Sequence, residues 1–286
     1  MIRSLLMFLT IVLWTGAAGA QAPFCDDLEG EQRLLAERLL ATEYLYDCCD
    51  GTIASCLDEK PTCALAARLA DNVCRRVAEG QDEVRIRRAL SRRARSMVGG
   101  GAPADIDLSE APAVGPDDAP VTVVVYACAR CPYCSELVPA LYEEVTAGVL
   151  RNDVRLAFRV FPIRGHEGST PAGLGFVAAA EMGAFWPFLN RAYGEFDAFS
   201  EERQVDWAAE AGLDRESFTA RIADPATREE LVESKKEGLV NGVEETPTVF
   251  INGRRWVGDL GLAELVDAMA EEVERVRGKR WVSNAE

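Results

Sequence analysis

The stretch CARCPYC, residues 128–134, carries three cysteines, Cys128, Cys131 and Cys134, each three positions from the next. The run VTVVVYA (121–127) precedes it and is rich in β-branched residues, which predicts a strand. The sequence that follows, from Pro132 to about residue 150, predicts a helix, since proline suits a first helical position that needs no N–H donor. We therefore expect Cys131 at the start of a helix, with its sulfur exposed.

A thiol at such a junction is expected to be reactive. The N-terminus of a helix presents unpaired N–H groups and the positive end of the helix dipole, and both stabilise a thiolate. Arg130 adds a cation beside Cys131 and should lower the pKa of that thiol further. Cys134 lies about one helical turn on, near enough to bond Cys131 and more covered. Cys131 and Cys134 are therefore the predicted redox pair, against the alternatives of an inert structural disulfide or a zinc site.

The other six cysteines lie between residues 25 and 74, and none follows residue 134. Cys63 and Cys74 share a predicted helix and would lie about 16 Å apart, too far for a disulfide. We expect bonds from Cys48 or Cys49 to Cys56 or Cys63. The predicted helices cover residues 31–49, 61–80 and 82–98. A metal cluster, or a second redox pair exchanging electrons with CARCPYC, is the alternative to a helical domain held by disulfides.

The N-terminus resembles a signal peptide over residues 1–20. Arg3 precedes a short apolar run, and Ala18 and Ala20 fit a cleavage site. An uncleaved membrane anchor is the alternative. Export places the protein in the periplasm or another extracytoplasmic, oxidising compartment, where disulfides persist. The predicted organisation is a signal peptide (1–20), a cysteine-rich helical domain (21–98), a linker rich in Gly, Pro and Asp (99–119) and a second domain (120–278).

Composition excludes several classes of function. The chain has 286 residues, a net charge of −16 and a pI of about 4.7, so a general nucleic-acid binder is not expected. His166 is the single histidine, which excludes a multi-histidine metal site and a CxxCH haem attachment. His166 is expected to cap or pack, with a place near the active-site surface as the alternative. We predict no resident metal and no cofactor.

The remaining patterns complete an α/β domain. VRLAFRVFP (154–162) predicts a second strand, and helical sequence fills about 170–240. GVEETPTVFINGRRWVG (242–258) predicts two strands joined at Asn252–Gly253, and residues 262–276 predict a closing helix.

Residues 118 to about 275 resemble the DsbA-like thiol-disulfide oxidoreductase family, which has a thioredoxin fold. The resemblance depends on CPYC (131–134), Pro139, TP (246–247) and the helices of about 170–240, which resemble the family's helical insertion. It implies an α/β thioredoxin-like fold with a helical insertion, preceded here by a small all-α disulfide-rich domain. The N-terminal domain lies outside the resemblance.

The resemblance also implies roles for single residues. Cys131 would be the nucleophile and Cys134 the resolving thiol, with Pro247 as a cis-proline facing the disulfide and the Thr246 backbone pairing with substrate. Two departures matter. Val125 occupies the place of a buried acid common in thioredoxins, which disfavours a reductase, and Pro132 and Tyr133 replace the His of strongly oxidising members, which predicts a milder oxidant.

Cys128 is left with three interpretations. It is a free, partly buried thiol, an alternative disulfide partner of Cys131, or a partner of an N-terminal cysteine.

The predicted function is an exported enzyme that exchanges disulfides with exported cysteine-containing proteins and with a membrane-bound or soluble redox partner. The alternatives are a disulfide isomerase or reductase, and a chaperone for soft metal such as copper that uses CARCPYC with Cys48 and Cys49.

Overall fold

The computed structural model of the chain describes residues 23–59 and 63–283. The predicted signal peptide therefore lies outside the described residues. The chain divides into two compact units, Met1–Arg87 and Arg88–Glu286. Among the described helices, none combines the length and the apolar character needed to cross a membrane.

The first unit consists of short helices that contact one central helix. They are α1 (Pro23–Asp26), α2 (Gly30–Thr42), α3 (Ile53–Asp58), α4 (Ala64–Ala78) and the first turn of α5 (Glu83–Val98). α1, α2 and α3 all contact α4. The α4 side chains Leu65, Leu69, Val73 and Val77 are buried at intervals of four residues, the spacing of one helical face. This confirms the predicted helical N-terminal region.

Three disulfides connect these helices. Cys25 bonds Cys74, Cys48 bonds Cys63, and Cys49 bonds Cys56. The expected pairing of Cys48 and Cys49 with Cys56 and Cys63 is confirmed, and the disulfide-bonded state replaces the alternative of a metal cluster.

The helix predicted over residues 31–49 is too long, because α2 ends at Thr42. Glu43 is extended, and Tyr44 forms an antiparallel bridge with Thr52. Cys48 has a positive φ of 57°, which a right-handed helix cannot contain. The segment turns back on itself so that the adjacent Cys48 and Cys49 can reach two different partners.

The second unit is built on a mixed sheet of five strands. They are β1 (Ala113–Val114), β2 (Val121–Ala127), β3 (Val154–Val160), β4 (Thr248–Ile251) and β5 (Arg254–Arg255). Their order is β1-β3-β2-β4-β5, with β2 and β3 parallel and every other pair antiparallel. The carboxyl ends of β2 and β3 therefore share one edge of the sheet with the start of β4. This edge carries the candidate site.

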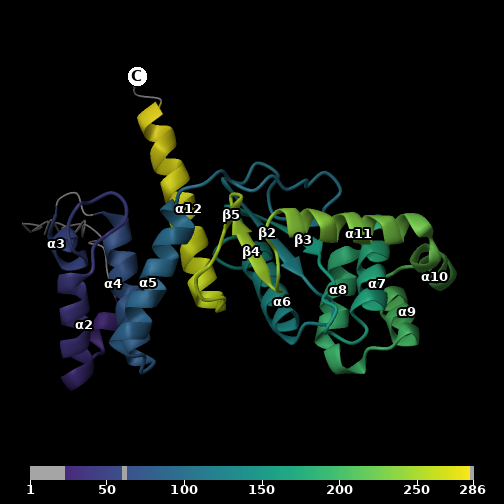
Figure 1. Ribbon diagram of the computed structural model, residues 1–286, viewed down its shortest axis with the longest axis horizontal. Coiled ribbons are helices and arrows are strands. Elements are labelled where there is room, and N and C mark those ends of the chain that lie inside the picture. The colour runs from purple at the N-terminus through teal and green to yellow at the C-terminus, as the bar shows by residue number, and fades with distance from the viewer. Residues whose placement is uncertain (1–22, 60–62, 284–286) are drawn as a thin grey trace, which may run out of the picture. The chain divides into compact units, whose positions relative to one another are not determined.

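Helices surround this sheet, and most of them lie between β3 and β4 in the sequence. They are α6 (Pro132–Thr146), α7 (Ser169–Glu181), α8 (Phe185–Gly194), the 3-10 turn η1 (Phe196–Ala198), α9 (Glu201–Glu210), α10 (Arg215–Ala223), α11 (Pro225–Val240) and α12 (Leu262–Ser283). Figure 1 shows α7, α8, α9 and α10 gathered on the β3 side of the sheet. The thioredoxin-like fold with a helical insertion is thus confirmed.

The segment 99–119, predicted as a linker, belongs to the second unit. It contains β1, which pairs with β3, and the Ala104 N–H donates to the Gly253 carbonyl over 2.8 Å. Ala104, Ile106 and Leu108 pack against the core formed by Val124, Tyr126 and Phe250. Apolar residues at every second position are typical of an extended segment with one buried face. The high Gly, Pro and Asp content of 99–119 predicted a linker instead.

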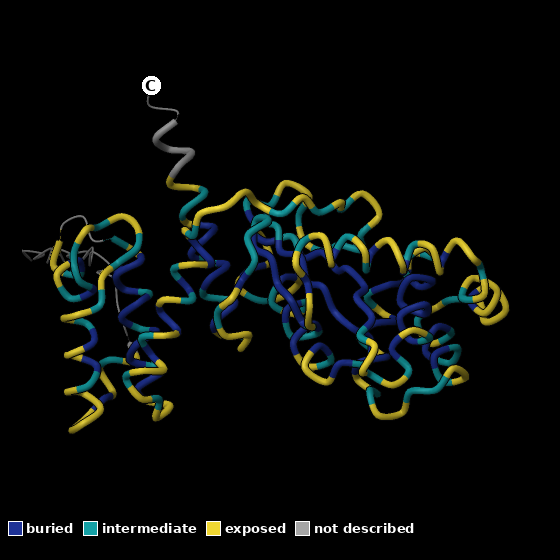
Figure 2. The backbone as a smooth tube through the Cα atoms, viewed as in Figure 1, coloured by how far each residue is buried: buried dark blue, intermediate teal, exposed yellow. Residues whose placement is uncertain are grey.

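The core of the second unit lies on both faces of β2. Val124 aligns with Ala157 of β3 and with Phe250 of β4, which puts the three side chains in one row. Figure 2 shows these strands as buried segments within more exposed helices. Gly238 of α11 allows this helix to approach closely, because a Cβ there would lie 2.7 Å from the Phe161 ring.

Candidate active site

Cys131 lies where β2 passes into α6. β2 ends at Ala127 and α6 begins at Pro132, so Cys131 is the N-cap residue with an extended backbone, as predicted. Its backbone N–H donates to the Cys128 carbonyl over 3.1 Å, which closes the turn between strand and helix. The expectation of an exposed sulfur is wrong, because Cys131 is only 1% exposed. The segment before β4 covers it: its Sγ lies 3.3 Å from the Thr246 carbonyl oxygen.

Cys134 lies one turn along α6 and is fully buried. Both cysteines are free thiols, and their side chains are hydrogen-bonded to each other. The hydrogen bond from the Cys134 thiol, with help from the Cys134 and Tyr133 backbone N–H groups, lowers the pKa of Cys131 to about 5. Burial raises the pKa of Cys134 far above its usual range. One thiolate and one protonated neighbour therefore stand side by side, as disulfide exchange requires.

Thr246 and Pro247 face this pair from the start of β4. The peptide bond between them is cis. The Thr246 carbonyl accepts a hydrogen bond from the Cys131 thiol when that group is protonated. The Thr246 hydroxyl is buried and has no hydrogen-bond partner among the described residues. It can donate to the Cys131 thiolate, which explains why this side chain also lowers the Cys131 pKa.

Arg130 does not act as the sequence predicts. Its guanidinium lies over the rings of Phe196 and Phe199, at 4.3 and 4.9 Å from their centroids, and donates to the Phe196 carbonyl. The groups that lower the Cys131 pKa are Cys134, Thr246 and Tyr133 instead. The η1 segment and the adjacent Phe199 bind the arginine because two aromatic faces and a carbonyl offer a planar cation more contacts than the buried Cys131 sulfur does. Arg130 therefore anchors the active-site turn to the helical insertion.

Cys128 is fully buried and is surrounded by polar groups. Its Sγ lies 3.2 Å from the Ser169 Oγ and 3.4 Å from the His166 Nδ1, and the Arg130 backbone N–H donates to it over 3.4 Å. The interpretation as a partner of an N-terminal cysteine is wrong, because those six cysteines bond one another. Cys128 is a free thiol, and its pairing with Cys131 remains a prediction.

Two residues of the site were not predicted from the sequence. Tyr193 of α8 is buried, and its hydroxyl donates to the Cys128 carbonyl over 3.2 Å. Ser169, the first residue of α7, accepts from the Ile163 N–H over 2.9 Å, so its own proton is free for Cys128. Nothing in the local sequence marks either residue, because both meet Cys128 only through the packing of the insertion on β3.

Tyr133 and Pro247 border an apolar cavity beside the thiols. Tyr133 is 72% exposed, which is unusual for a large aromatic side chain and leaves its ring available for contact. Leu137, Leu260 and Leu262 complete the apolar part of the lining. The cavity lies next to Thr246, whose backbone borders it as well.

The metal-chaperone alternative loses part of its ligand set. Cys48 and Cys49 are consumed by disulfides and offer no thiolates. Within residues 23–59 and 63–283, the one compact group of three candidate ligands is Cys49, Cys56 and Glu59, and it contains one of those disulfides. Two bonded sulfurs are poor metal ligands, since the thiolate is the ligating form.

Comparison with known proteins agrees with this geometry. The thioredoxin family matches residues 108–271. Oxidised BdbD from Bacillus subtilis superposes with a TM-score of 0.54 at 19% identity, over 60% of this chain and 98% of that one. The alpha-DsbA1 protein of Wolbachia pipientis superposes with a TM-score of 0.54 at 17% identity, over 61% of this chain and 96% of that one. These likenesses establish the fold.

The chain also resembles part of curated proteins that are named as antiporters. The Na(+)/H(+) antiporter NhaA of Herminiimonas arsenicoxydans is 33% identical over 161 residues, which are 56% of this chain and 25% of that protein. The chain thus spans about a quarter of the length of the curated relatives it matches. Because the matched family covers more than half of the chain, including the CPYC turn and the cis-proline segment, the protein belongs to the thioredoxin family and has its DsbA-like fold.

Proposed function

We propose that the protein is an exported thiol-disulfide oxidoreductase in which Cys131 is the attacking and leaving thiol and Cys134 the resolving thiol. The observation that carries the proposal is the Cys131 sulfur at the start of α6, beside the buried Cys134 and 3.3 Å from the Thr246 carbonyl oxygen. Substrates are proteins that carry cysteines, and a membrane-bound or soluble redox partner restores the disulfide.

The exchange proceeds in two steps. A substrate thiolate attacks Cys131 Sγ in the Cys131–Cys134 disulfide, and Cys134 leaves and takes up a proton. A second substrate thiolate then attacks the substrate sulfur of the mixed disulfide and releases Cys131 as a thiolate. The substrate loses two electrons, and the Cys131–Cys134 pair gains them.

The proposed direction is oxidation of substrates. A low pKa stabilises Cys131 as a leaving group and stabilises the reduced enzyme, and both favour passing the disulfide on. Val125, at the position of the buried acid of thioredoxins, is an apolar core residue and cannot take a proton from Cys134. The alternative activities are reduction and isomerisation of substrate disulfides. Both begin with an attack of the reduced Cys131 on a substrate disulfide.

Thr246 and Pro247 are the proposed contact for the substrate backbone. Their segment lies against Cys131 and borders the apolar cavity with Tyr133. An extended peptide in that cavity would bring its cysteine to the Cys131 sulfur. Substrate binding must also move part of this cover, since Cys131 is almost fully buried without substrate.

A periplasmic or similar extracytoplasmic location is part of the proposal. The disulfides of the first unit support it, because such bonds persist in oxidising compartments and are rare in the cytosol.

Two cysteine variants test the proposal. We expect Cys131→Ser to abolish the oxidative refolding of a reduced, disulfide-containing substrate and the reduction of insulin. Cys134→Ser, the same substitution one turn away, should instead accumulate a mixed disulfide between Cys131 and the substrate. Mass-spectrometric mapping of disulfides across a redox titration should find a Cys131–Cys134 bond that opens reversibly without denaturant. A bond that never forms, or activity that survives in Cys131→Ser, would overturn the proposal.

A further inference from the structure

A second groove borders the candidate site on its β3 side. It lies between α11 and the loop 162–168 that leads from β3 into α7, and α11 and α7 contact each other (Figure 1). We call it the basic groove. Its cationic lining residues are Arg164, Arg228, Lys235 and Lys236, and Glu167 is the single acidic residue among those that line it in the described chain. This concentration of positive charge stands out on a chain with a net charge of −16.

Two of these cations have no carboxylate partner. No described carboxylate lies within ion-pair distance of Arg164 or Arg228, and both residues are exposed. The arginines of the helical insertion behave differently, since each of the following pairs with an acid: Arg191, Arg203, Arg215 and Arg221. Lys236 pairs with Glu233 at 2.6 Å, whereas Arg164 and Arg228 carry charge that their own unit does not neutralise.

Apolar side chains alternate with these cations along α11. Arg228, Val232, Lys235 and Leu239 are spaced by four, three and four residues, which puts them on one face of the helix. Val232 is 44% and Leu239 is 55% exposed, so the apolar positions of this face are not covered by the chain. A complementary ligand has to carry acidic and apolar groups in turn, which a polypeptide segment does and a small inorganic anion does not.

The loop that forms one wall of the basic groove also contacts the active-site turn. His166 and Ser169 lie within hydrogen-bond distance of Cys128 Sγ, and the Cys128 carbonyl accepts from the Cys131 N–H. The apolar cavity that Tyr133 and Thr246 border carries the acids Glu136 and Glu245 instead of cations. The basic groove and the apolar cavity therefore differ in the sign of their charge.

We propose that the basic groove binds an acidic segment of the substrate, with glutamate or aspartate side chains at Arg164 and Arg228 and apolar side chains at Val232 and Leu239. This inference rests on the proposed function, because it identifies the class of polypeptide that Cys131 serves. The groove selects substrates in which an acidic, partly apolar segment accompanies the reacting cysteine. Unneutralised cations beside a reactive group also accelerate the encounter with an acidic partner.

The first experiment measures binding without chemistry. A fluorescein-labelled, cysteine-free peptide in which glutamate alternates with leucine is titrated with the full chain, beside a peptide with lysine in place of glutamate. We expect the acidic peptide to bind more tightly and to weaken as salt rises. Arg164→Glu and Arg228→Glu should each weaken its binding by about five- to tenfold.

Arg151→Glu is the matched control. Arg151 is exposed, precedes the opposite end of β3 and changes the net charge by the same amount when replaced. We expect this control to bind the acidic peptide like the unmodified chain. Equal binding of the two peptides, or equal losses in Arg151→Glu and the groove variants, would overturn the inference.

The second experiment separates this inference from the proposed function. Rates of disulfide exchange are measured with dithiothreitol and with a peptide that joins the acidic segment to a cysteine. The groove variants should lower kcat/KM for the acidic peptide and leave the rate with dithiothreitol unchanged. No exchange with dithiothreitol would refute the proposed function and leave the binding result standing, whereas normal exchange without discrimination between peptides would refute the basic groove alone.

Discussion

Cys131 shows how a single residue acquires its chemistry from its neighbours. The helix start supplies N–H groups, Cys134 supplies a hydrogen bond from one turn away, and Thr246 supplies a hydroxyl from a segment 115 residues distant. The sequence predicts the first contribution and places Cys134 within reach of Cys131, since both follow from residues within or beside CARCPYC. The contribution predicted for Arg130 is replaced by that of Thr246, because Phe196 and Phe199 bind the guanidinium.

The depressed pKa predicts the pH dependence of the thiol. In the reduced protein, alkylation of Cys131 by iodoacetamide should rise through about pH 5 and level off above about pH 6, because the thiolate is the reactive form. In urea the rate should keep rising to about pH 9, as for an ordinary thiol. The pKa of Cys131 is lower in the folded protein than in the unfolded chain, so ionisation of this thiol stabilises the reduced fold. The stabilisation is complete above about pH 9. That stabilisation declines as the pH falls and is lost below about pH 5.

Cys134→Ala provides the control for this profile. It removes the main hydrogen-bond donor to Cys131, so the inflection should move toward higher pH. Mass spectrometry of the alkylated peptide identifies the reacting cysteine. An inflection near pH 8.5 in the folded, unmodified protein would contradict the assignment of Cys131 as a stabilised thiolate.

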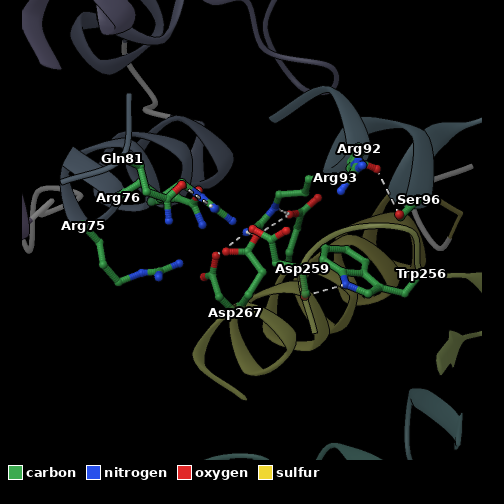
Figure 3. A network of polar contacts seen from close by, with 12 residues as sticks. Arg75, Arg76, Gln81, Arg92, Arg93, Ser96, Trp256, Asp259 and Asp267 are labelled. Atoms are coloured by element: carbon green, nitrogen blue, oxygen red, sulfur yellow. Dashed lines mark hydrogen bonds and ion pairs between the residues drawn. The ribbon is translucent and has the colours of Figure 1, made fainter. Parts of the chain in front are cut away.

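At the scale of elements, α5 and α12 are joined by a buried arginine. Arg93 is 1% exposed and forms ion pairs with Glu264, Asp267 and Glu271 of α12, the last two at 2.6 Å (Figure 3). Arg93 thus connects the part of α5 that belongs to the second unit with α12 of the same unit. Several hydrogen bonds to one guanidinium compensate the loss of its hydration.

Replacement of this arginine should destabilise the second unit. Arg93→Met removes a buried cation from beside Glu264 and Glu271, and we expect a loss of about 3–5 kcal/mol in the free energy of unfolding. Urea unfolding followed by tryptophan fluorescence measures it, because Trp186, Trp207 and Trp256 all lie in this unit. Arg95→Met, on an exposed position of the same helix, should change stability by less than about 0.5 kcal/mol. A similar small effect of both variants would show that the network adds nothing to stability.

At the scale of the molecule, the two units are stabilised in different ways. The second has a sheet covered by helices, with a core of aromatic and β-branched residues. The first has a small helical core, and its disulfides restrict the unfolded chain. A small domain needs such crosslinks because it buries too little apolar surface.

The disulfides of the first unit should differ in their effect. Cys25–Cys74 spans 49 residues and Cys49–Cys56 spans 7. Chain entropy predicts a stabilisation of about 4 kcal/mol for the longer loop and about 2.4 kcal/mol for the shorter one. Cys25→Ala with Cys74→Ala should therefore lower the protection of the α4 amides against hydrogen exchange more than Cys49→Ala with Cys56→Ala does. Equal or reversed losses would show that packing, and not loop closure, sets the stability.

Much of the fold follows from patterns that are local in the sequence. The strand at 121–127, the helix start at Pro132, the Asn252–Gly253 turn and the apolar face of α4 depend on side chains within one or two turns of each other. The same locality explains the errors. The helix predicted through Cys49 ends at Thr42, because the disulfides to Cys56 and Cys63 redirect the chain. Residues 104–108 lie in the segment predicted as a linker, but their apolar side chains pack against a core that is distant in the sequence.

The spacing of CARCPYC and the TP dipeptide at 246–247 were therefore sufficient to predict which two cysteines lie side by side and which segment faces them. The burial of Cys131, the polar surroundings of Cys128, the anchoring of Arg130 and the basic groove arose only from folding. Each brings together groups from β2, β3 and the helical insertion that lie many residues apart. No local sequence pattern predicts these contacts, because the packing of helices and strands sets the distances between the groups that form them.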